Sequence, residues 1–138
     1  GKSINVIRSF TGKGTLVWGA RTLLGNSNEW RYVSVRRFIG LIERSINEST
    51  QWVVFEPNEP ATWARLVASV ENYLTQLWRN GALQGTKPGD AFWVQCGLGQ
   101  TMTVADVSAG RLKLSVALAV TRPAEFQLLG VSDSVRPA

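Results

Sequence analysis

The sequence predicts an α+β fold, a two-layer sandwich in which two main helices cover a mixed β-sheet, with extended segments at both ends of the chain. Three observations lead to this prediction. Apolar residues recur every three or four positions around residues 35–46 and 60–81, as on the faces of amphipathic helices. Residues 111–120 alternate apolar and polar side chains, as a half-buried strand does. Short apolar runs bounded by Gly or Pro predict further strands at 3–10, 15–23, 51–57 and 91–97.

The first two strands are separated by a glycine-containing segment, "TGKG" at residues 11–14. Glycines around a lysine also begin several phosphate-binding loops. A P-loop, however, needs four residues between its first glycine and a Gly-Lys-Ser/Thr triplet, and a helix afterwards. Here a strand pattern follows, so we expect a tight turn or bulge between two strands. Gly19, inside the second strand, predicts a bulge or a close approach of another segment.

The helices have recognisable faces and ends. "GNSNEW", residues 25–30, predicts a turn before the first helix, whose apolar stripe is Val35, Phe38, Ile39, Ile42 and Ile46. In the second helix Pro60 suits the first turn and Gly81 suits the end. Thr103 predicts the cap of a short helical turn over 103–110. After the strand at 111–120, Pro123 sets off a last extended piece.

The charge and size of the chain limit the possible functions. With 138 residues and 44% apolar residues the chain fits one globular domain. Its net charge is +5, and 11 arginines outnumber 4 lysines, which favours bidentate pairing with carboxylate or phosphate groups. The partner could be nucleic acid, a membrane surface or an acidic protein, or the charge could be ordinary solvated surface.

Catalysis has little chemistry available in this sequence. The chain has no histidine and a single cysteine, Cys96, so neither a histidine-based nucleophile system nor a disulfide can form within it. We expect no metal and no cofactor. Glu56 and Glu59 in "FEPNEP" are the candidate carboxylates of an enzyme hypothesis, but turn formation and helix capping explain them more simply.

The six tryptophans predict anchors of the core or of a subunit interface. Trp18, Trp52 and Trp93 fall in predicted strands, whereas Trp63 and Trp78 fall on the stripe of the second helix. A base-stacking surface would alternate aromatic and basic residues, and "AFWVQC" lacks the basic ones. The net charge of +5 nevertheless makes a basic nucleic-acid-binding module the alternative function, which a salt titration of duplex binding would test.

Six segments, in order, give the chain a family resemblance. They are "INVIRSFTGKGTLVWGARTL", "EWRYVSVRRFIGLIERSI", "QWVVFEPNEPATWARLVASVENYLTQLWRNGALQG", "AFWVQCG", "TMTVADVSAGRL" and "TRPAEFQL". Together they resemble the C-terminal, inner domain of contractile tail sheath proteins, from phage tails, R-type bacteriocins and extracellular contractile injection systems. The resemblance spans roughly residues 4 to 129.

This resemblance implies a structural protein and not an enzyme. Sheath subunits form a helical sleeve around a rigid tube and contract to drive the tube through a target envelope. The implied partners are further copies of the chain, the inner tail tube protein, and baseplate and terminator proteins, with no nucleic acid and no membrane insertion. The implied location is the virion tail or contractile particle, after assembly in the bacterial cytoplasm. The 138 residues would be one domain, 1–138, of a longer sheath protein.

The resemblance also implies two sets of contact residues. Neighbouring sheath subunits exchange arms that add strands to each other's sheets. Within a candidate arm at 124–138, the strand-forming segment is Ala124, Glu125, Phe126, Gln127, Leu128, Leu129, Gly130 and Val131, and folding of this segment onto its own domain is the alternative. Contacts with an acidic tube would come from basic residues outside the apolar stripes, for which the candidates are Arg36, Arg37, Arg44, Arg65, Arg79 and Lys87.

Overall fold

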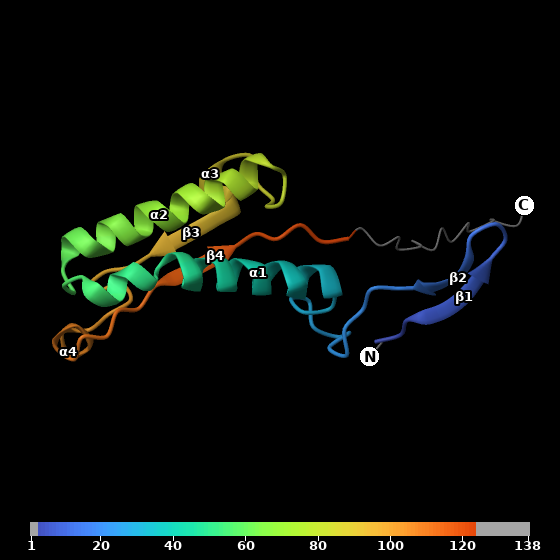
Figure 1. Cartoon of the computed structure of the whole chain (residues 1–138), viewed down its shortest axis with the longest axis horizontal. Coiled ribbons are helices and arrows are strands. Elements are labelled where there is room, and N and C mark those ends of the chain that lie inside the picture. The colour runs from blue at the N-terminus through green and yellow to red at the C-terminus, as the bar shows by residue number, and fades with distance from the viewer. Residues whose placement is uncertain (1–2, 124–138) are drawn as a thin grey trace, which may run out of the picture.

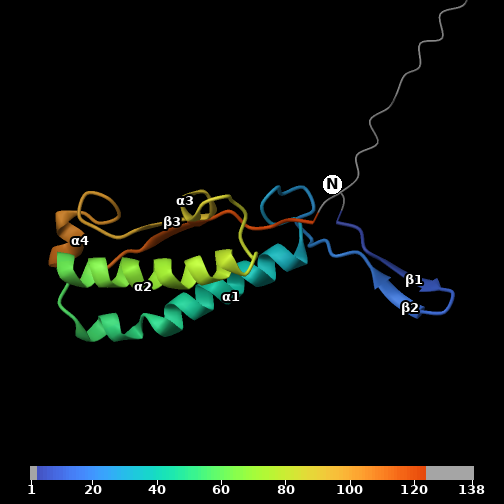
Figure 2. The same ribbon diagram turned by 90° about the horizontal axis from the view of Figure 1, so that it is seen from above.

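The computed structural model describes residues 3–123 and divides them into an elongated helical body and a hairpin that projects from one end (Figure 1). In the body, the two long helices form one layer and a short sheet forms the other (Figure 2). The predicted α+β class and the two main helices are therefore confirmed. The two-layer arrangement holds for the body alone, because the hairpin extends beyond it.

The projecting hairpin pairs β1 (Val6–Phe10) with β2 (Gly14–Trp18) in antiparallel register. The turn between them is tight: the Lys13 N–H donates to the Phe10 carbonyl at 3.1 Å. Gly12 and Gly14 both have positive φ, +77° and +75°, which side chains with a Cβ rarely adopt. The glycines that flank Lys13 thus lie in a hairpin turn, as predicted, and a strand follows them instead of the helix that a P-loop requires.

Asn5 and Gly19 meet where the hairpin joins the body. The Asn5 side chain donates from Nδ2 to the Arg21 carbonyl at 2.8 Å and accepts from the Arg21 N–H at 2.9 Å. Gly19 has φ +141°, and a Cβ at this position would lie 2.5 Å from Asn5 Oδ1. The close approach predicted at Gly19 is confirmed. β2 ends at Trp18, however, earlier than the predicted strand at 15–23.

The helical layer consists of α1 (Val33–Ser49) and α2 (Pro60–Arg79). α2 begins with its proline in the first turn, where a missing N–H costs nothing. It ends in a Schellman motif, in which the Ala82 N–H donates to Leu77 and the N–H of Gly81, at φ +78°, donates to Trp78. The predicted ends of the second helix are thus confirmed to within a few residues.

The segment between the helices corrects one prediction. Residues 51–57 were expected to form a short apolar strand, but Gln51–Phe55 form a 3-10 helix, η1. The chain leaves α1 at Thr50 and must reverse direction before α2 begins at Pro60, so a tight turn fits this connection better than an extended segment. Val53 packs against the core, whereas Val54 and Phe55 are 81% and 91% exposed, so burial accounts for only part of the apolar character of this run.

The second layer contains α3 (Pro88–Ala91), β3 (Phe92–Gln95), α4 (Val104–Ser108) and β4 (Ser115–Leu118). β3 and β4 pair antiparallel, with Val94 opposite Val116. Within residues 3–123 the strands therefore form two separate antiparallel pairs, where the sequence predicted one mixed sheet. The alternation predicted over 111–120 is confirmed in burial, although only its middle forms a regular strand.

The core lies between the two layers of the body. Its fully buried side chains come mainly from the apolar stripes of the helices, with Val94, Cys96 and Met102 from the sheet side. The main members of this core are Ile42, Trp63, Leu66, Val70, Leu74, Val94, Cys96 and Met102. Burial in the core raises the pKa of the Cys96 thiol. Most of the helix stripes read from the sequence therefore face the core.

Candidate assembly surfaces

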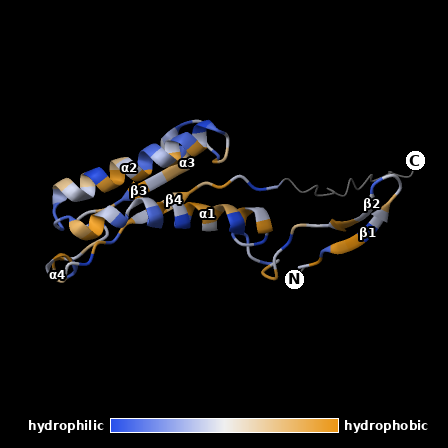
Figure 3. Cartoon of the chain, viewed as in Figure 1, coloured by the Kyte–Doolittle hydropathy of each residue, from blue (hydrophilic) through white to orange (hydrophobic). Residues whose placement is uncertain are grey.

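The hairpin exposes apolar side chains on both of its faces. Ile7 and Val17 lie opposite each other on one face and are 73% and 71% exposed. Val6 and Trp18 form the equivalent pair on the other face and are also exposed. Figure 3 shows this predominance of hydrophobic residues along β1 and β2. Such a surface is typical of a site that another chain covers.

The backbone of the hairpin is also incompletely paired. β1 pairs with β2 alone within the described residues, so each strand has one open edge. Phe10 packs on Trp18 with ring centroids 4.7 Å apart, and the hydroxyls of Ser9 and Thr15 lie 2.9 Å apart. An isolated two-stranded hairpin is marginally stable in water, and additional strands stabilise it. The hairpin can therefore accept strands at its edges.

Three of the predicted basic candidates have partners within the body. The Arg36 guanidinium lies over the Trp30 ring at 4.5 Å, and that of Arg65 lies over Trp52 at 4.8 Å. Arg65 also pairs with Glu56 at 3.4 Å. Arg44 pairs with Glu48, one helical turn later, at 2.8 Å. Neither arginine–tryptophan contact could be predicted from the sequence, because neither pair has the i,i+3 or i,i+4 spacing of neighbours on a helix.

The other three candidates, Arg37, Arg79 and Lys87, make no ion pair with any described residue, and all three are exposed. Arg37 and Arg44 are seven residues apart on α1 and therefore share a helix face. Arg79 ends α2, and Lys87 precedes α3 at the same end of the body (Figure 1). The six candidates thus lie in several places. The arm segment 124–131 lies outside the described residues.

A buried carboxylate holds the short helix α4 to the strand that follows it. Asp106 accepts hydrogen bonds from the main chain and hydroxyl of Thr103, which completes the predicted cap as a capping box. It also pairs with Lys113 at 2.9 Å and Arg111 at 3.2 Å. The bond from Lys113, followed by those from Thr103, holds the pKa of Asp106 well below its ordinary range. The Thr-x-x-Asp spacing would have identified the reciprocal cap, but not the two cations.

The structure does not place Glu56 and Glu59, the two carboxylates of the enzyme hypothesis, in one pocket. Glu56 pairs with Arg65 and lines a groove of the body, whereas Glu59 does not line that groove. Glu59 occupies the N-cap position of α2, but its side chain makes no capping hydrogen bond. Residues 3–123 contain no cluster of three potential metal ligands. None of the helices they form is long and apolar enough to cross a bilayer.

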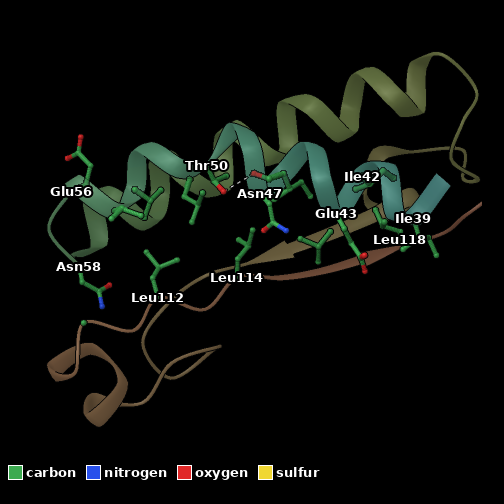
Figure 4. A pocket seen from close by; sticks show the side chains of 16 residues that line it. Ile39, Ile42, Glu43, Asn47, Thr50, Glu56, Asn58, Leu112, Leu114 and Leu118 are labelled. Atoms are coloured by element: carbon green, nitrogen blue, oxygen red, sulfur yellow. Dashed lines mark hydrogen bonds between the residues drawn. The ribbon is translucent and has the colours of Figure 1, made fainter. Parts of the chain in front are cut away.

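A groove of the body lies between α1 and the strand side (Figure 4). It has a volume of about 720 Å³. Its walls are mostly aliphatic, and Glu43, Asn47 and Asn58 are among its few polar lining residues. An apolar groove of this form suits a hydrophobic polypeptide segment better than a charged small molecule.

The chain belongs to a known class of protein. A family model described as the phage tail sheath C-terminal domain matches residues 26–130, and the chain belongs to this family. Among curated proteins, the tail sheath protein of Vibrio phage KVP40 is 26% identical over 74 residues, which are 54% of this chain and 11% of that protein. The family is one of structural sheath proteins.

Solved structures of contractile particles contain chains with the same fold. A chain in the extracellular contractile injection system PVC sheath complex, in its contracted state, is 47% identical over 96% of this chain, with a TM-score of 0.83. A chain in the anti-feeding prophage baseplate is 44% identical over 94%, with a TM-score of 0.85. This chain spans only 37% and 36% of the lengths of those two chains.

Proposed function

We propose that this chain is the C-terminal, inner domain of a longer sheath subunit that polymerises into a helical sleeve around a tail tube. On contraction the sleeve drives that tube through a target envelope. The observation that carries the proposal is the hairpin, whose strands have open edges and whose apolar faces are exposed in a member of the tail sheath family. The role is structural, without catalysis or cofactor.

The hairpin and the arm have complementary roles in this proposal. The segment 124–131 of one copy adds as a strand to an edge of the β1–β2 hairpin of another copy. Main-chain hydrogen bonds then hold the sleeve together while the bodies move. Contraction takes its free energy from newly buried apolar surface, at about 25 cal/mol per Å².

The inner tube protein is a proposed partner that the basic residues contact weakly. Exposed ion pairs contribute about 0–1 kcal/mol each and are screened by salt, so a sleeve can release the tube as it contracts. Arg37, Arg79 and Lys87 are the best candidates, because the described residues offer them no competing ion pair. Baseplate and terminator proteins would contact the ends of the sleeve, and assembly would take place in the bacterial cytoplasm.

The experiment compares two valines of equal exposure in the full-length sheath protein. Val17, on the hairpin, is 71% exposed, and Val104, on α4, is 70% exposed. Val17→Lys is expected to abolish sleeves in electron micrographs, because a charge would be desolvated between paired strands. Val104→Lys is expected to leave them intact. Circular dichroism of both variants checks that the body still folds.

Deletion of residues 124–138 tests the arm separately. We expect folded subunits that form no sleeves. Normal sleeves from the Val17→Lys variant and from the deletion would refute the exchange of strands at the hairpin. A sheath protein that stayed monomeric at high concentration, without any substitution, would refute the function itself.

A further inference from the structure

Within residues 3–123, the edge of β4 that faces away from β3 has unused main-chain hydrogen-bonding groups. The Ala119 N–H donates to the Ala91 carbonyl at 2.8 Å, which fixes residue 119 as facing the β3 side. Successive residues of an antiparallel strand face opposite sides, so Ser115 and Ala117 also face β3, whereas Val116 and Leu118 face outward. Lys113 agrees with this alternation, because its carbonyl accepts from the Thr101 hydroxyl at 2.6 Å.

The outward-facing residues continue beyond the regular strand. The four are Leu112, Leu114, Val116 and Leu118. Apart from the β3–β4 ladder, no main-chain hydrogen bond between described residues involves any of them. The open edge therefore runs over seven residues, about 23 Å of extended chain. This length is enough to pair with a complete additional strand.

The same four residues also form the apolar floor of the groove. The side chains of the three leucines lie across the groove from Ile39 and Ile42 of α1 (Figure 4), and Val116 and Ile46 also line it. An incoming strand would thus find open N–H and C=O groups in the plane of the sheet and aliphatic side chains above them. Both requirements for strand addition, pairing and apolar burial, meet at one place.

The widths of the two layers indicate how much of the sheet is absent. Strands lie about 4.8 Å apart in a sheet, whereas packed helices lie about 8–10 Å apart. Two adjacent helices therefore cover about four strands, but the body sheet has two. α2 packs against β3, so α1 extends beyond β4 and covers the open groove. An added strand beside β4 would occupy part of the space beneath α1.

We infer that this edge is completed by an extended strand from the same sheath polypeptide, contributed by a segment outside these 138 residues. The strand has apolar side chains at alternate positions, which enter the groove, and pairs with residues 112–118. The inference rests on the proposed function in one respect, that this chain is one domain of a longer subunit. It adds that the body edge is closed within the subunit, unlike the hairpin edges.

Two observations favour the same polypeptide over a neighbouring copy. The chain spans 36–37% of the sheath chains it matches in the solved structures, so each of those polypeptides has a large remainder that could supply the strand. The groove also separates part of α1 from the strand layer, so Ile39 and Ile46, which line it and are half-buried, can be fully covered only when the groove is filled. Such packing stabilises a subunit before it meets other copies.

Amide hydrogen exchange, resolved by residue, tests the inference on three samples. These are the 138-residue chain, the full-length polypeptide diluted to single subunits, and assembled sleeves. We expect the amides of Val116 and Leu118 to exchange at least about tenfold more slowly in single full-length subunits than in the 138-residue chain. The amides of Ser115 and Ala117 are internal controls, because β3 protects them in every sample.

Two results would overturn the inference. Equally fast exchange at Val116 and Leu118 in the 138-residue chain and in single full-length subunits would show an edge that the polypeptide leaves open. Protection that appears only in sleeves would assign the edge to another copy. In either case sleeves would still form, so the proposed function would stand. If the edge were protected in single full-length subunits but no sleeves formed, the inference would stand and the proposed function would be refuted.

A proline substitution provides a second measurement. Val116→Pro removes the outward N–H, and Val116→Ala serves as the control for the lost side chain. In the full-length subunit we expect Val116→Pro to lower Tm by several degrees more than Val116→Ala does. In the 138-residue chain we expect the two variants to differ little, because an open edge tolerates proline. Ala117→Pro should lower Tm in both proteins, because the Ala117 N–H faces β3. Equal Tm values for the two Val116 variants in the full-length subunit would contradict the inference.

Discussion

The β1–β2 hairpin and the helical body place their apolar residues in opposite environments. In the body, Ile42, Val70 and Leu74 are nearly inaccessible to water and pack between two layers. In the hairpin, Ile7 and Val17 have similar hydrophobicity and are more than 70% exposed. The difference shows that hydrophobic composition alone does not predict a core. Apolar residues in a strand indicate a surface that becomes buried, and the segment that buries it can belong to another polypeptide.

The largest expected effect is a difference in how much the free energy of unfolding falls when an apolar side chain is shortened in the body or in the hairpin. Leu74→Ala should lower the free energy of unfolding by about 2–5 kcal/mol, because it leaves a cavity in a fully buried site. Ile7→Ala should change it by no more than about 0.5 kcal/mol, because that side chain is already in water. Urea unfolding of the 138-residue chain measures both. An equal loss for Ile7→Ala would contradict the exposure of the hairpin.

The second effect tests the junction between the two regions. Gly19→Ala should cost about 1–3 kcal/mol, because its φ is unfavourable for alanine and the new Cβ would clash with Asn5 Oδ1. Gly40 is the matched control, since it lies within α1 and a Cβ there meets nothing within 4 Å. Gly40→Ala should stabilise the protein by about 0.5–1 kcal/mol through helix propensity. Thermal unfolding would show shifts of opposite sign.

A third effect concerns Asp106 and depends on pH. Its pKa is lowered by folding, so its stabilising contribution is present above the unfolded value, about 3.9, and is lost as the pH falls below it. Asp106→Asn should therefore lower Tm at pH 7 and lower it by less near pH 2, where part of this contribution has already been lost. Asp90→Asn is the control, because Asp90 is exposed and accepts one bond from Thr86. A loss of Tm for Asp106→Asn that did not vary with pH would exclude the ion pairs as its cause.

The smallest effect belongs to the solvated surface of the body. Arg44 and Glu48 form an exposed i,i+4 pair, which contributes about 0.3–0.5 kcal/mol and weakens with salt. Arg44→Ala should lower the unfolding free energy by this amount at low ionic strength and by less at 1 M salt. A loss well above 1 kcal/mol that persists in salt would indicate a further partner for Arg44.

Local patterns predicted most of the body. Helix periodicity located α1 and α2, Pro60 and Gly81 located the ends of α2, and Thr103 located the cap of α4. Each signal lies within a few residues of the feature it predicts, so it does not depend on the rest of the fold.

The errors concern what a segment packs against. Residues 51–55 have β-branched and aromatic side chains but lie in a short connection between two helices, so chain reversal prevails over strand propensity. The division into two sheets depends on pairings distant in sequence, such as β3 with β4, which no local pattern specifies. The contact of Arg36 with Trp30, and the groove beneath α1, also depend on tertiary structure.

Cys96 has a practical consequence for following assembly. It is the only cysteine of the chain, it is buried, and burial raises the pKa of its thiol, so little reactive thiolate reaches the surface. Many copies can therefore be concentrated under mildly oxidising conditions without accidental cross-links. A cysteine introduced at an exposed position would be the dominant site for a fluorophore or a cross-linker, and the native thiol would not have to be removed first.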